Sequence, residues 1–251
     1  MIKLLSLIFF LLLLMVGKKR GFKTFITFYL NLLLIVIYIT FMKIGLNPII
    51  LSIIICIISS LITLFILNGF NVKTKSSFIS IMFVLLIMSI ITILICKFSN
   101  IESFSIEDIE SIGYYSHDIN YNMMGVVIGM YLICTIGTII DTSISVSSAM
   151  NEVYKNNTNM SEKELYISGM NIGKDILSTT INTLYFALIC SFIGFFMWFY
   201  SVSFPFLSVS KSLVKNIIEL LLAFIASISI IPITAKVGSK LIIKYHIKDK
   251  I

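Results

Sequence analysis

The chain has 251 residues, of which 58% are hydrophobic and only 12% are charged, and its mean hydropathy is +1.04. This composition excludes a water-soluble domain and predicts a protein with several membrane spans. The net charge of +7 does not indicate nucleic-acid binding, because Lys and Arg stand beside the ends of apolar runs, where they act as topology signals. The long apolar runs lack the alternation of a β-barrel, so we predict an all-α fold in a lipid bilayer.

Seven apolar runs have spanning or nearly spanning length: 2–16, 25–42, 48–67, 78–96, 122–149, 176–200 and 216–235. They predict a single transmembrane helical domain over 1–251 with about seven transmembrane helices. The first run is short and also resembles a signal peptide. No small-residue cleavage site follows it, however, and "GKKRGFK" comes directly after it, so we favour an uncleaved helix.

Basic residues are concentrated in alternate connections of this seven-span arrangement. They occur in "GKKRGFK", in "NGFNVKTK" and in the tail after Thr234, whereas an acidic segment lies between the fourth and fifth runs. The positive-inside rule then places the N-terminus outside and the C-terminus inside.

Possible metal ligands are few and poorly spaced. Each of the four cysteines stands alone in an apolar run, which is typical of small buried hydrophobic residues: Cys56, Cys96, Cys134 and Cys190. The external segment carries Glu102, Glu107, Asp108, Glu110, His117 and Asp118. We favour a solvated acidic cap there, and weak cation attraction is the alternative. We expect no metal and no cofactor.

Asp141 is the only formally charged residue between Asp118 and Glu152. A carboxylate in hydrocarbon costs at least about 2.5–3.5 kcal/mol. On a helix of 3.6 residues per turn it shares a face with small and polar residues, and we predict that this face is turned to the bundle interior. The other members of this stripe are Cys134, Gly137, Thr138, Ser145, Ser148 and Glu152.

The next helix carries a matching stripe of Asn171, Asp175, Ser178, Asn182 and Tyr185, with Thr179 at its edge. The two helices follow each other through a cytoplasmic connection, so we expect them to pack antiparallel with their stripes facing. The Asp141 carboxyl should then lie within direct or one-water hydrogen-bond reach of Asn182, Thr179 or Ser178. The stripes can serve as helix–helix glue. For Asp141 we favour a proton or ion pathway, because an uncharged residue would glue at lower cost.

Two further features have alternative interpretations. Ser161 and Glu164 form a capping-box pattern, which predicts a helix start near Glu162. The segment 161–170 is then an elbow on the membrane surface, which we favour, or a partner-docking helix. Glu219, in the last run, is either a second relay group or a side chain that snorkels outward, and we favour snorkelling.

The run "GTIIDTSISVSSAMNEVYKNN" and the following "SGMNIGKDI" and Asn182-Thr183 closely resemble the signature of the YibE/F-like family of bacterial membrane proteins. The earlier "GLNP" and "LNGFNVKT" are also similar to that family. The resemblance implies a multi-pass protein of the bacterial cytoplasmic membrane whose activity is not established. Longer relatives carry an extracellular domain ahead of the helices, so the chain resembles the short partner of a YibE/YibF pair.

A fainter resemblance is to half of an RND-type transporter bundle. Gly137 with Asp141, Glu152, the segment 161–170 and Gly173 match it, but no Tyr follows Asp141 and no Arg stands a turn or two later. This resemblance implies a proton relay.

These observations favour a permease-like protein, coupled to protons or cations through Asp141, with an unnamed substrate. The alternative is a non-transporting membrane subunit or scaffold for a longer YibE-type partner, and a homo-oligomer is a further possible assembly. No nucleophile with its base, no phosphate loop and no zinc motif occurs in the sequence, so we expect no enzyme activity.

Overall fold

The computed structural model describes residues 2–98, 122–199 and 211–248. The elements in these ranges are α1 (Ile2–Lys43), α2 (Pro48–Leu61), a π-helical segment η1 (Ile62–Ile66), α3 (Val72–Phe98), α5 (Met123–Asn156), α6 (Glu162–Phe199) and α7 (Lys211–Lys248). The all-α prediction is confirmed for these ranges.

Five helices within the described ranges are long and apolar enough to cross a membrane. They are α1, α2 with η1, α3, α5 and α7. The chain is therefore a multi-span membrane protein. The seven predicted runs fall on six helices because the first two runs both belong to α1. Helix α6 is not among the five candidates; its first half carries the polar residues of the second stripe.

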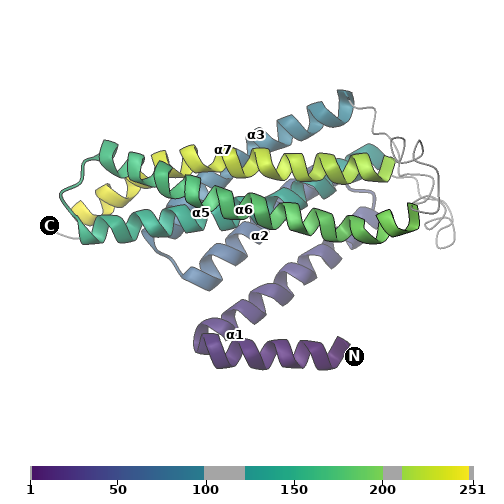
Figure 1. Cartoon of the computed structure of the whole chain (residues 1–251), viewed down its shortest axis with the longest axis horizontal. Coiled ribbons are helices and arrows are strands. Elements are labelled where there is room, and N and C mark those ends of the chain that lie inside the picture. Colours follow the sequence, from purple (N-terminus) through teal and green to yellow (C-terminus); the bar gives the residue numbers. More distant parts are fainter. Residues whose placement is uncertain (1, 99–121, 200–210, 249–251) are drawn as a thin grey trace.

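Helix α1 is a hairpin of two helical arms, which meet at Lys18, where φ is 46° and ψ is −123°. The chain reverses direction there, so the first arm lies beside the second (Figure 1). A Cβ at Gly21 would collide with the Leu13 carbonyl oxygen, which is why this position needs glycine. The arms are joined by Phe10 and Phe25, whose ring centroids lie 4.5 Å apart. The first run is thus helical, as predicted.

The core lies between α3, α5 and α7, which pack on one another along the bundle, while α2 covers α5 on one side and α6 contacts α5 and α7 on the other. Helix α1 lies at the edge, against α2 and η1. Glycines let α6 approach closely, because a Cβ at Gly173 would collide with Ile231 of α7. The largest fully buried apolar side chains of the three central helices include Ile81, Met88, Ile128, Ile139, Leu222 and Ile230.

Five buried hydroxyl residues join the three central helices, and we call them the hydroxyl cluster: Ser76 and Ser77 of α3, Ser143 and Ser147 of α5, and Thr234 of α7. The oxygens of Ser76 and Ser147 lie 2.5 Å apart, and those of Ser143 and Thr234 lie 3.1 Å apart. Ser147 also donates to the Lys73 carbonyl at 2.9 Å. Small hydroxyl residues of this kind hold membrane helices together at short range.

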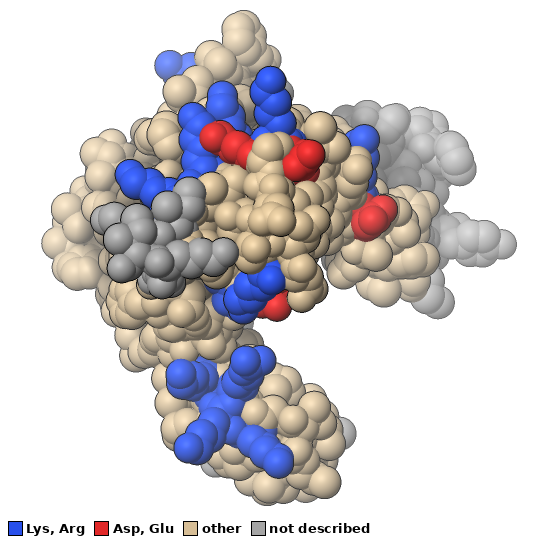
Figure 2. Space-filling view, turned by 90° about the vertical axis from the view of Figure 1, so that its left-hand side faces the viewer, with Lys and Arg blue, Asp and Glu red and all other residues tan. Residues whose placement is uncertain are grey.

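The elements that carry the three basic segments lie at one end of the bundle. These are the bend of α1, the start of α3 and the end of α7, all on the left in Figure 1. Figure 2, which looks onto that end, shows many Lys and Arg side chains gathered there. The prediction that these segments share one side therefore agrees with the arrangement of the helices.

Candidate functional site

The stripe that contains Asp141 lies on the outer side of α5. Cys134, Gly137, Asp141 and Ser145 are all exposed. The prediction that this face is turned to the bundle interior is wrong, and none of the carboxylates in the described residues is buried. The reason lies on the same helix: the buried face of α5 contains Ser143 and Ser147, which bond to α3 and α7 and so fix the rotation of α5.

The polar stripe of α6 is also exposed. Helices α5 and α6 do pack antiparallel, as predicted, but their stripes do not face each other. Among the described hydrogen bonds, none joins Asp141 to Ser178, Thr179 or Asn182. Thr179 instead donates to the Ile176 carbonyl of its own helix at 2.8 Å. The exposed members of the stripe are Asn171, Asp175, Ser178, Thr179, Asn182 and Tyr185.

Asp141 instead lines a cavity of about 280 Å³ between α1, α2, η1 and α5, which we call the Asp141 cavity. Its polar lining consists of Asp141 together with Asn31 of α1, Ser59 of α2 and Thr63 of η1. Apolar residues complete the wall, and Gly137 lies beside the carboxylate on the same helix. The cavity is thus a largely apolar space between candidate membrane spans, with four polar side chains in its wall.

A short hydrogen-bond chain joins α1 to α2 and η1 at the wall of this cavity. The Asn31 amide donates to Thr63 Oγ1 at 3.1 Å and accepts a bond from Ser59 Oγ at 3.0 Å. Thr63 belongs to the π-helical segment, and π-helical turns inside helices are frequent at functional sites. No hydrogen bond is made to the Asp141 carboxyl by the described residues, so its oxygens are available to a proton, a small cation or water in the cavity.

Sequence reasoning missed Asn31, Ser59 and Thr63. Asn31 is the only amide in the run 25–42, and Ser59 and Thr63 are four residues apart on one helix face. A single strongly polar residue within an apolar run, opposite a pair of hydroxyl residues at i and i+4, was the signal available for them.

A second cavity lies between α5, α6 and α7, with a volume of about 210 Å³. Glu219, Asn216 and Cys134 line it. That Glu219 snorkels outward stays a prediction. The cysteine prediction holds for the buried Cys56 and Cys96, whereas Cys134 and Cys190 are exposed.

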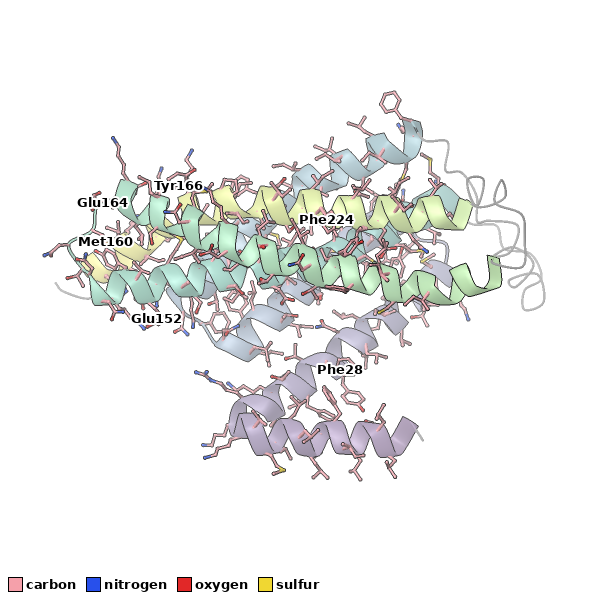
Figure 3. All side chains as sticks on the ribbon, viewed as in Figure 1. Phe28, Glu152, Met160, Glu164, Tyr166 and Phe224 are labelled. Atoms are coloured by element: carbon pink, nitrogen blue, oxygen red, sulfur yellow. The ribbon has the colours of Figure 1, made fainter. Side chains whose placement is uncertain are left out.

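The capping box at the start of α6 is confirmed. The Ser161 N–H donates to Glu164 Oε2 at 2.8 Å, and the Glu164 N–H donates to Ser161 Oγ at 3.4 Å. The first of these bonds holds the pKa of Glu164 below its usual value. Figure 3 labels Met160, Glu164 and Tyr166 at this end of the bundle.

The segment 161–170 is not an elbow on the membrane surface. It is continuous with the rest of α6, and Leu165 is fully buried against Met150 and its neighbours, so this first part of the helix packs on the bundle. The predicted acidic cap, from Glu102 to Asp118, lies outside the described residues. The described ranges contain no group of three or more His, Cys, Asp or Glu that could hold a metal ion.

No curated protein and no solved structure matches the chain. The family of YibE/F-like proteins matches residues 5–244, which includes α5 with Asp141 and the helices that enclose the Asp141 cavity. The chain belongs to the YibE/F-like family.

Proposed function

We propose that the chain is a permease-like membrane protein in which Asp141 takes up and releases a proton or a small cation. The single observation that supports this proposal is the position of Asp141 at a cavity whose other polar groups come from two neighbouring candidate spans. A carboxylate at this depth is costly, and such residues commonly mark proton or ion pathways. The proposed role is not enzymatic.

The surroundings of Asp141 suit reversible binding of a small cation. The carboxylate supplies the charge, while Asn31, Ser59 and Thr63 supply neutral oxygens and N–H or O–H donors, including those that order water. The hydrogen bond from Ser59 to Asn31 holds the amide in place, so these groups are preorganised around the cavity. An ion at Asp141 would then have these polar groups as ligands on the side of the cavity.

We further propose that the basic end of the bundle faces the cytoplasm, with the N-terminus outside, in the bacterial cytoplasmic membrane. The support is the gathering of Lys and Arg at the end that contains the α1 bend, the start of α3 and the end of α7. Cytoplasmic connections in membrane proteins are enriched in these residues.

The test is proton flux into proteoliposomes that contain the purified chain, followed with a pH-sensitive dye under an imposed pH gradient. We expect Asp141→Asn to lower the flux at least tenfold, because asparagine fills the same space but cannot titrate. Glu162→Gln is the control, since Glu162 is an exposed carboxylate at the start of α6 and lines no part of the Asp141 cavity; it should leave the flux unchanged.

Flux above background that is equal for the wild type and Asp141→Asn would reject the proposal. If the purified wild-type chain gives no flux above background, the result would instead favour the role of a non-transporting subunit or scaffold for a longer YibE-type partner. Fluorescence from the dye in protein-free vesicles sets the background for both outcomes.

A further inference from the structure

The outward side of α5 and α6 is polar where a membrane protein is expected to be apolar. We call this surface the polar face. Its members are exposed and consist of Gly137, Asp141 and Ser145 on α5, and Asn171, Asp175, Ser178, Thr179 and Asn182 on α6. Helix α5 packs against α2, α3, α6 and α7. Gly137 and Asp141 border the Asp141 cavity on one side, but they and Ser145 remain exposed.

The polar face lies in the middle of the bundle along its length. Asp141 is about half way along α5, a candidate membrane span, and Asn182 is about half way along α6. Lipid offers no hydrogen bonds at this depth, so amide, hydroxyl and carboxyl groups exposed to it lose the bonds that water would give. The exposed apolar residues of α3, such as Leu86 and Ile90, suit contact with lipid, and the polar face does not.

The chemistry of the polar face fits a second copy of the chain as its binding partner. Two copies in one bilayer have the same orientation, so the two-fold axis that relates them is perpendicular to the membrane. Such an axis places α6 of each copy opposite α5 of the other. The polar face supplies carboxylate acceptors on both helices and amide and hydroxyl donors on α6, which makes it complementary to itself.

The depths of the residues agree with this arrangement. Asp141 lies about 15 residues before the end of α5, and Thr179 lies about 17 residues after the start of α6. At 1.5 Å per residue, both are about 22–26 Å from the connection between the two helices. Ser145 and Asp175 form a second such pair, nearer the basic end.

We propose that the polar face is the contact surface between two copies of this chain, with the Asn182 amide of one copy donating to the Asp141 carboxylate of the other and Thr179 beside it. The second copy then supplies the partners that the isolated bundle does not give to this carboxylate. This inference stands apart from the proposed transport, because it rests on the exposure of the polar face alone.

The test is disulfide cross-linking in membranes between two differently tagged copies, one with Ser145→Cys and the other with Asp175→Cys. Both carry Cys134→Ala and Cys190→Ala, which remove the two exposed native thiols. This pair leaves Asp141, Thr179 and Asn182 intact. The control pair is Leu86→Cys with Ile90→Cys, on the outward side of α3, where the side chains are 59% and 60% exposed. We expect at least tenfold more mixed dimer from the first pair.

A second measurement is dimerisation in lipid vesicles, followed by energy transfer between labelled copies. Asp141→Leu combined with Asn182→Leu should weaken dimerisation at least tenfold while the monomer stays helical by circular dichroism, because both side chains are exposed and leucine suits lipid. A chain that is monomeric in vesicles, or a dimer that the leucine variant does not weaken, would overturn the proposal. So would cross-linking of Ser145→Cys to a different membrane protein in place of the second copy.

Discussion

Helix α5 contributes to both the hydroxyl cluster and the polar face, yet only its residues in the cluster have side-chain hydrogen bonds to neighbouring helices in the described structure. Ser143 and Ser147 of α5 are fully buried and bonded to α3 or α7, whereas Asp141 and Ser145, two positions away from them, are exposed. Successive residues of a helix are separated by 100°, so these pairs point to different sides of α5. Both sides of α5 are polar, so polarity alone does not decide which side of a membrane helix is buried in the bundle.

The two sides of α5 differ in the size of their polar side chains and in whether those side chains exchange hydrogen bonds with a neighbouring helix. Ser143 and Ser77 donate to each other's backbone carbonyl oxygens at 3.4 and 3.2 Å, which requires that α3 and α5 approach closely. Serine permits this approach and a carboxylate does not, because aspartate is larger and would leave an unpaired charge between the helices. The rotation that buries the serines therefore exposes Asp141.

The largest effect is expected when the hydroxyl cluster is broken. Ser147→Leu adds bulk where α3 and α5 touch and removes the bonds to Ser76 and the Lys73 carbonyl, so we expect a loss of roughly 2–3 kcal/mol in unfolding free energy. Thermal unfolding of the detergent-solubilised chain measures it. Ser145→Leu is the matched control on the exposed side and, measured on the monomer in the same detergent, should leave the melting temperature nearly unchanged. Equal losses from both variants would contradict the comparison.

Glycines on the two sides offer the next test. A Cβ at Gly173 would collide with Ile231 across the α6–α7 contact, so Gly173→Ala should cost about 1–2 kcal/mol. A Cβ at Gly137, on the polar face, would meet no atom within 4 Å. In the monomer, Gly137→Ala should therefore be neutral or slightly stabilising, since alanine has the higher helix propensity. Chemical unfolding of both variants in the same detergent separates them.

Local features of the sequence predict the helices well. The lengths of the apolar runs and the Ser161–Glu164 pattern are set by residues close together in the chain, and they give the helix positions and the start of α6. The connection predicted at "GKKRGFK" is where the chain turns between the two arms of α1, but the form of that turn depends on a positive φ at Lys18, a residue type that gives no such signal. Helical periodicity likewise shows which residues share a face but not which neighbour that face meets.

The Asp141 site illustrates this last point. Periodicity correctly groups Asp141 with Gly137 and Ser145, and all three are exposed together. Helix α5 has a second polar side, however, and the choice between the two depends on contacts with α3 and α7, which are distant in sequence. The other polar residues that line the Asp141 cavity, such as Asn31, come from α1, α2 and η1, whereas the two predicted stripes lie on α5 and α6.

A smaller effect is expected at the Asp141 cavity. Asn31→Leu removes the bonds to Thr63 and Ser59, and hydrogen bonds between membrane helices contribute little each, so we expect a loss of roughly 0.5–1.5 kcal/mol. Thermal unfolding in detergent measures it. Thr40→Ala is the control, because Thr40 bonds only to carbonyl groups of its own helix in the described structure. A larger loss from Thr40→Ala than from Asn31→Leu would show that the bonds at the cavity wall are not formed.

The smallest effect is expected at the capping box, which lies apart from both polar surfaces. Ser161→Ala should weaken the first turn of α6 by about 0.5–1 kcal/mol, seen as roughly two- to five-fold faster amide hydrogen exchange there. The pKa of Glu164 is held below its usual value of 4.5 by the Ser161 N–H, so the bond is fully present above pH 4.5 and is lost as the pH falls through the lowered pKa. Exchange in this turn, corrected for its intrinsic pH dependence, should therefore accelerate under acid conditions. Glu164→Gln keeps an acceptor that does not titrate, so its corrected exchange should stay constant; the same acid acceleration in this variant would assign the effect to another group.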